Sequence, residues 1–125
     1  MPPFTRFDHV QLAIPAGAEE RARSFYIGVL GFEELAKPPH LAQRGGLWLR
    51  SGSVDLHLGV DPRFHAAHKA HPALRCRDYG AVLESLRDHG VEFVEDSHPI
   101  GKAPHCYVYD PFGNRIELIG EDAGE

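Results

Sequence analysis

The chain has 125 residues, the length of a single domain, and the composition of an ordinary globular protein. Its formal net charge of −5 excludes the basic surface that nucleic-acid-binding domains present. No apolar run approaches the ~18 residues of a membrane span, and the first residues lack the pattern of a secretory signal. We therefore expect a cytoplasmic protein without membrane or nucleic-acid partners, in which Cys76 and Cys106 are free buried thiols.

The first half of the chain predicts four strands and one helix. Alternation of apolar and polar residues predicts strands over 7–14, 32–36, 46–51 and 54–60. A stripe of apolar residues predicts a helix over 18–30, which Gly31 ends. Lys37-Pro-Pro-His40 is expected to be a loop.

The second half repeats this order after a linker over 61–70. A strand is expected over 71–77, and Asp78 is a suitable N-cap for a helix over 79–89. A strand over 91–95 and a loop over 97–104 follow. The turn residues Asp110-Pro-Phe-Gly-Asn114 separate two alternating runs, 105–109 and 115–119, which predicts a β-hairpin.

The order strand, helix and three strands therefore occurs twice, in modules over 4–61 and 70–121. From Gly31 to His57 is 26 residues, and from Gly90 to Glu117 is 27. Matching offsets of this kind indicate an internal duplication. We expect one α+β domain over 1–125, in which two βαβββ modules form a curved sheet of eight strands with the helices outside.

Four side chains suited to metal binding occupy equivalent places in this repeat, on the first and last strand of each module: His9, His57, His71 and Glu117. Imidazole and carboxylate groups are ligands of zinc, iron, nickel and manganese. If each module curls its sheet, the four side chains converge on one divalent metal ion. One carboxylate then leaves about one net positive charge, which stabilises a developing oxyanion.

Three longer segments carry a family likeness: Asp8-His-Val-Gln-Leu-Ala-Ile14, Ser24-Phe-Tyr-Ile-Gly-Val-Leu-Gly-Phe32 and Asp110-Pro-Phe-Gly-Asn-Arg-Ile-Glu-Leu118. Together with His71-Pro-Ala-Leu74, they resemble the vicinal oxygen chelate superfamily over roughly residues 4–120. This superfamily includes glyoxalase I, extradiol dioxygenases, fosfomycin-resistance thiol transferases and bleomycin-resistance proteins.

The resemblance implies metal ligands at His9, His71 and Glu117, because members place ligands on the first, fifth and eighth strands. Glyoxalase I has a glutamate at the fourth-strand position, where this chain has His57. His57 is then either a fourth ligand or a base beside the metal, oriented by a neighbour such as Asp55. The alternative for these residues is an ordinary structural role on their strands.

Alternation places Tyr107 on the face that Glu117 shares across the predicted hairpin. A tyrosine at this position contacts substrate in the fosfomycin-resistance relatives, which makes Tyr107 a candidate proton donor; the alternative is a ring that fills the barrel mouth. Tyr107 and Glu117 are the candidate catalytic residues. The candidates for substrate binding are Gln11, Trp48, Arg50, His105 and Tyr107, and the arginine suits an anionic substrate.

The resemblance implies a metal-dependent enzyme that acts on a small oxygenated substrate able to chelate the metal. Lyase or isomerase chemistry of the glyoxalase type is the leading interpretation. The alternatives are an extradiol-type dioxygenase and a metal-free binding protein like the bleomycin-resistance proteins. Relatives of this length form dimers, some of which complete the metal site across subunits, so we expect a homodimer.

Overall fold

The computed structural model describes residues 1–101 and 103–121; residues 102 and 122–125 of the predicted domain lie outside the described residues. The elements of the first module are β1 (Val10–Ile14), α1 (Glu19–Arg23), η1 (Ser24–Val29), β2 (Glu33–Leu35), α2 (Pro39–Ala42), β3 (Leu47–Ser51) and β4 (Val54–Val60). Those of the second are β5 (Ala73–Arg75), α3 (Tyr79–Asp88), β6 (Phe93–Ile100), β7 (Ala103–Tyr109) and β8 (Arg115–Ile119).

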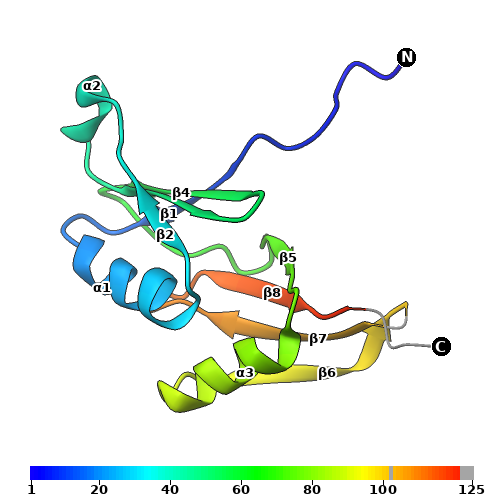
Figure 1. Ribbon diagram of the computed structural model, residues 1–125. Coiled ribbons are helices and arrows are strands. Elements are labelled where there is room, and N and C mark those ends of the chain that lie inside the picture. The colour runs from blue at the N-terminus through cyan, green and yellow to red at the C-terminus, as the bar shows by residue number, and fades with distance from the viewer. Residues whose placement is uncertain (102, 122–125) are drawn as a thin grey trace.

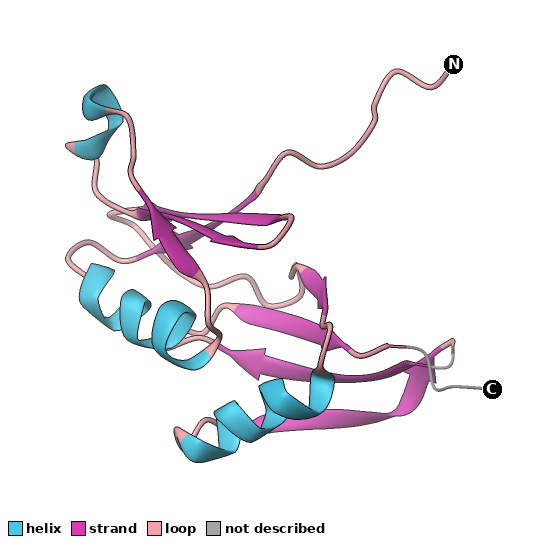
Figure 2. Cartoon of the chain, in the orientation of Figure 1, coloured by secondary structure: helices cyan, strands magenta, loops and turns pink. Residues whose placement is uncertain are grey.

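The eight strands form two four-stranded sheets, one from each module (Figure 1). The strand orders are β1-β4-β3-β2 and β5-β8-β7-β6, so the two modules have the same topology. In each sheet the first and last strands of the module are parallel neighbours, and the other pairs are antiparallel. The predicted α+β fold of two βαβββ modules is therefore confirmed. Figure 2 shows α1 and η1 below the first sheet and α3 beside the second, whereas the short α2 projects away from both.

Alternation along the strands separates a core face from an open face in the first sheet. Leu47, Leu49, Leu56 and Leu58 are at most 2% exposed and belong to one core with Ala22 and other residues of α1 and η1. Burying each such leucine contributes about 1.5–3 kcal/mol relative to leaving it in water. The intervening residues of the same strands, which include the candidate site residues, project from the opposite face.

Two predictions of local structure are wrong. The short helix α2, Pro39 to Ala42, begins inside the loop predicted over 37–40, because a proline at the first helical position pre-sets the backbone and lacks only an N–H that would have no partner there. The predicted loop over 97–104 is the end of β6, a turn at Gly101 and the start of β7. Pro99 is tolerated there because β6 is an edge strand, and the ladder shifts register between Asp96 and Ile100.

The turn of the β7–β8 hairpin joins the two modules. The buried carboxylate of Asp110 accepts hydrogen bonds from the backbone N–H groups of Phe112 and Asn114, at 2.9 and 2.8 Å. It also accepts a 2.7 Å bond from the hydroxyl of Tyr26 in η1. The Asn114 side chain donates to the carbonyl oxygen of Ala13 in β1. The Asp-Pro-Phe-Gly-Asn motif thus holds its own turn and positions the first module on the second.

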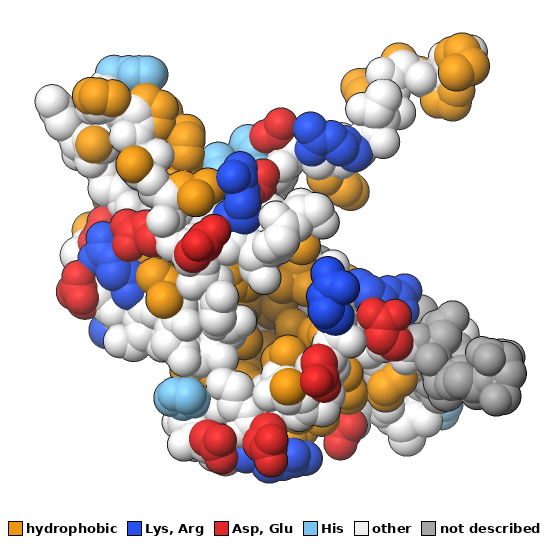
Figure 3. All heavy atoms as spheres, in the orientation of Figure 1, with side chains coloured by type: hydrophobic (Ala, Val, Ile, Leu, Met, Phe, Trp, Pro, Cys, Tyr) orange, Lys and Arg blue, Asp and Glu red, His pale blue; other side chains and the backbone are white. Residues whose placement is uncertain are grey.

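A hollow with mostly apolar walls lies between the modules (Figure 3). It has a volume of about 350 Å³ and is bordered by the end of η1, β5 and α3. At its border, the hydroxyl of Ser85 in α3 donates a hydrogen bond to the carbonyl oxygen of Val29.

The first residues of the chain extend away from both sheets as an arm that leads to β1 (Figures 1 and 3). Phe4 and Phe7 in this arm are 90% and 86% exposed. Within the described part of the chain, no helix is long and apolar enough to cross a membrane.

Candidate metal and substrate site

A cluster of ionisable side chains lies on the second sheet around Glu117. Residue 117 in β8 pairs with Ala73 of β5 on one side and with Tyr107 of β7 on the other. This register brings His71, two residues before Ala73, to the carboxylate, with its Nε2 3.1 Å from Oε1. His105 of β7 lies on the other side, with its Nδ1 2.8 Å from Oε2. Glu117 is only 6% exposed, so its charge needs these partners.

The hydrogen bonds of His71 suit its Nε2 to metal binding. Its Nδ1 lies 2.7 Å from the carbonyl oxygen of Lys69, which can only accept, so Nδ1 carries a proton. In the neutral ring, Nε2 then presents a lone pair to the carboxylate of Glu117. Two acceptors that face each other at 3.1 Å require a cation between them, either a proton or a metal ion. Two ligands at ~2.1 Å from one metal ion lie about 3 Å apart in an octahedral arrangement and about 3.4 Å apart in a tetrahedral one, so the 3.1 Å spacing falls between the two.

His105 has both ring nitrogens engaged and is 4% exposed. Its Nε2 donates to the carbonyl oxygen of His98 at 2.7 Å, so its contact with Glu117 needs a second proton on the ring. Burial opposes the charged form, but the His98 carbonyl and the Glu117 carboxylate outweigh burial and raise the pKa of His105. In this structure the predicted substrate-binding residue therefore holds Glu117 in position.

Tyr107 lies beside this cluster, where alternation placed it. Its ring meets those of His71 and His105 edge-on, each with a centroid distance of 5.7 Å. The guanidinium of Arg115 covers the ring at 4.2 Å from the centroid. These three contacts hold the ring in one orientation beside Glu117.

The other two predicted ligands lie together on the first sheet. His57 of β4 stacks on His9 with a centroid distance of 4.0 Å, and on Trp48 of β3 with a distance of 4.5 Å. Desolvation and the neighbouring charge of His9 lower the pKa of His57, which favours a neutral ring with a free lone pair. Asp55 pairs with Arg50 at 2.7 Å, and no described contact joins it to the ring of His57. The described contacts of Asp55 therefore go to Arg50, and they give no support to the alternative in which Asp55 orients His57.

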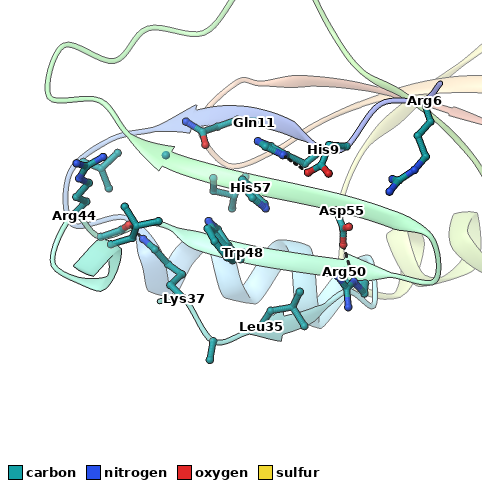
Figure 4. A pocket seen from close by; sticks show the side chains of 17 residues that line it. Arg6, His9, Gln11, Leu35, Lys37, Arg44, Trp48, Arg50, Asp55 and His57 are labelled. Carbon is teal, nitrogen blue, oxygen red and sulfur yellow. Dashed lines mark hydrogen bonds and ion pairs between the residues drawn. The ribbon is translucent and has the colours of Figure 1, made fainter. Parts of the chain in front are cut away.

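These rings line a pocket of about 910 Å³ on the open face of the first sheet (Figure 4). The predicted residues Gln11, Trp48 and Arg50 all line it, and Gln11 folds over Gly59, where a Cβ would lie 2.5 Å from the amide nitrogen. Arg50 makes an ion pair with Asp55, so its charge is largely neutralised. Arg6, Lys37 and Arg44 also line the pocket, and sequence patterns missed them because they lie outside the strands.

One chain brings the four predicted ligands together as two pairs, His9 with His57 and His71 with Glu117. Among residues 1–101 and 103–121, no group of three histidine, cysteine or carboxylate side chains is arranged to hold a metal ion. Each pair taken separately has suitable chemistry: two stacked imidazoles in one, and an imidazole facing a buried carboxylate in the other.

Comparisons with known proteins agree with this topology. The model of the Glyoxalase/Bleomycin resistance protein/Dioxygenase superfamily matches residues 6–118. A glyoxalase family protein from Bacillus anthracis has a structure with a TM-score of 0.89 and 40% identity, covering 98% of this chain and 100% of that one. Lactoylglutathione lyase from Agrobacterium tumefaciens, at 20% identity, shares the fold, with a TM-score of 0.69 and coverage of 95% and 96%.

A metapyrocatechase from Geobacillus stearothermophilus is 29% identical over 132 residues, which cover 98% of this chain. The chain spans 38% of the length of that curated relative. Because the family model matches nearly the whole chain, the protein belongs to the glyoxalase/bleomycin resistance protein/dioxygenase superfamily, also called the vicinal oxygen chelate superfamily.

Proposed function

We propose that two copies of this chain form a metal-dependent enzyme whose active sites are each completed by both subunits. In each site, His9 and His57 come from one subunit, and His71 and Glu117 come from the other. The substrate is a small oxygenated molecule that chelates the metal, and the reaction is of the lyase or isomerase type. The observation that carries the proposal is the pair of facing acceptors, His71 Nε2 and Glu117 Oε1, at 3.1 Å.

The sheet edges support assembly between two chains. β1 and β5 are edge strands, and a predicted histidine ligand lies just before each of them, His9 and His71. Edge strands present unpaired backbone groups that favour pairing with another strand. A two-fold dimer that sets β1 of one subunit beside β5 of its partner brings the two ligand pairs together twice. The exposed Phe4 and Phe7 of the adjoining arm would also gain a surface to cover them.

The side chains then have separate roles in the reaction. A divalent zinc, iron, nickel or manganese ion held there would supply Lewis-acid stabilisation of negative charge on a substrate oxygen. Glu117 provides the only anion of the ligand set, and His105 holds its carboxylate through Oε2. Tyr107 directs its hydroxyl to the substrate as a hydrogen-bond or proton donor. Gln11 and Trp48 line the floor on which the substrate lies.

Mixed dimers test the proposal. The variants His9→Ala and Glu117→Gln should each retain little metal, because each removes a ligand from both sites of its homodimer. When the two variants are unfolded, mixed in equal amounts and refolded, half of the dimers contain one intact site. Metal analysis should then recover about a quarter of the wild-type content per chain. If each variant binds poorly and the mixture recovers nothing, the site is not shared; full metal content in Glu117→Gln alone would remove that residue from the ligand set.

Dioxygenase chemistry is the second candidate, and the 29% identity to a metapyrocatechase across the whole chain favours it. Iron-loaded protein would then consume oxygen in the presence of a catechol. Zinc-loaded protein would be inactive in the same assay, because zinc has no redox chemistry. Oxygen consumption that depends on Glu117 would replace the lyase or isomerase assignment with this one.

A further inference from the structure

We propose that the substrate of the pocket on the first sheet carries an anionic group, a carboxylate or a phosphate, which is held by Arg44 with the help of Lys37. This inference rests on the proposed function, because it concerns the substrate of the same site. It is carried by an uneven distribution of charge along the pocket.

One end of the pocket is electrically balanced. The guanidinium of Arg50 binds the carboxylate of Asp55 at 2.7 Å, and Asp8 binds the ring of His9 at 2.9 Å. Arg6 lies at this end in Figure 4, and its charge acts on both Asp8 and Asp55. The cationic groups here are therefore matched by neighbouring carboxylates.

The other end has cationic groups and no carboxylate in its lining. Figure 4 shows Arg44 and Lys37 together at this end, beyond Gln11 and Trp48. Within the described residues, no acidic side chain lies within ion-pair distance of Arg44. The positive charge of Lys37 is partly compensated by the carboxylate of Glu19. This carboxylate lies outside the pocket lining and accepts a hydrogen bond from the backbone N–H of Gly46. Arg44 is the exposed cation that this end leaves without a partner.

The loop between α2 and β3 is built to hold Arg44 over the pocket. Lys37 donates a hydrogen bond to the carbonyl oxygen of Gly45, which fastens the loop to the end of β2. Gly45 and Gly46 both have positive φ, at 76° and 83°. A Cβ at Gly46 would overlap the carbonyl oxygen of Leu58 in β4, so the loop passes tightly against the sheet. The side chain of Arg44 is therefore attached to a constrained stretch of backbone at the rim of the pocket.

The pocket connects this end with two of the predicted metal ligands, His9 and His57. Lys37, Arg44 and His57 line the same pocket, so one bound molecule can reach both the cations and the histidine. A guanidinium binds carboxylate and phosphate oxygens through two parallel N–H groups, which gives both affinity and orientation. A substrate bound at both ends would have its chelating oxygens at the histidines and its anionic group at Arg44.

Two hydroxamates of equal length test the inference. Butanohydroxamate and succinate monohydroxamate offer the same metal-chelating group, but only the second carries a carboxylate at its far end. Binding is followed by the visible spectrum of the cobalt-substituted protein. We expect succinate monohydroxamate to bind at least about tenfold more tightly, the effect of one charge-assisted contact. Arg44→Gln should abolish most of this preference, and Arg44→Lys should retain part of it.

Arg63→Gln is the matched control, because it removes the same charge from an exposed side chain outside the pocket lining and should keep the preference within about threefold of wild type. Equal binding of both hydroxamates by wild type would overturn the anionic substrate while leaving the metal site intact. Equal loss in the Arg44 and Arg63 variants would overturn the assignment to Arg44. Failure of both hydroxamates to bind would overturn the proposed function, and this inference with it.

Discussion

His105 provides a direct test of how the site is supported. Its ring joins the buried Glu117 carboxylate at 2.8 Å and the carbonyl oxygen of His98 at 2.7 Å. In His105→Gln, an uncharged amide can replace one bond but cannot carry the second proton. A hydrogen bond to a charged group contributes about 1.5–3 kcal/mol and a neutral one about 0.5–1.5 kcal/mol, so we expect a loss of about 1–2 kcal/mol.

This loss should appear in two measurements on the variant. Urea unfolding of the metal-free protein at pH 6 should show a free energy of unfolding lower by about 1–2 kcal/mol. Competition with a chromophoric chelator should show metal affinity reduced by about tenfold or more, because Glu117 loses the group that orients it. His98→Gln is the control, since it keeps the backbone carbonyl and changes only an exposed side chain.

The pH dependence has a definite sign. The folded-state pKa of His105 is raised above its usual value of 6.5, so its contribution to stability is complete below that value. The contribution is lost as pH rises through the folded-state pKa. The cost of His105→Gln should therefore be larger at pH 6 than at pH 9. An equal cost at both values, or metal affinity within about threefold of wild type, would refute the role of His105 as the proton-bearing support of Glu117.

Two further substitutions test the module junction and the role of His57. Tyr26→Phe removes the donor to buried Asp110 and should lower the free energy of unfolding by about 1–3 kcal/mol, whereas Tyr109→Phe, at a side chain 51% exposed, should change it by less than about 0.5 kcal/mol. Equal effects in urea unfolding would show that the Tyr26 bond adds nothing. His57→Ala should reduce metal affinity by about tenfold or more if the ring is a ligand, as competition with a chelator would measure. Unchanged affinity with lost turnover would instead make His57 a base.

The sequence by itself determined the two modules, their strand order and the face on which most candidate residues lie. Alternation with period two is a local property, so it correctly separated Ile116 and Leu118 from Glu117, and it placed Tyr107 opposite that carboxylate. The turn residues from Asp110 to Asn114 likewise specify their hairpin through short-range hydrogen bonds. The repeat offsets matched His57 of β4 with Glu117 of β8, because equivalent strands of the two modules adopt equivalent registers.

Only the tertiary structure decided which of these residues meet. The extension of β6 through residue 100 brings the carbonyl oxygen of His98 within hydrogen-bond distance of His105. The pairing of β3 with β4 places Arg50 opposite Asp55, where the two side chains form an ion pair. The loop before β3 places Arg44 at the pocket, with no periodic signal to mark it. These contacts depend on loop paths, on register and on the separation of the two sheets. All three are set by packing between distant segments, which local patterns of hydrophobicity do not encode.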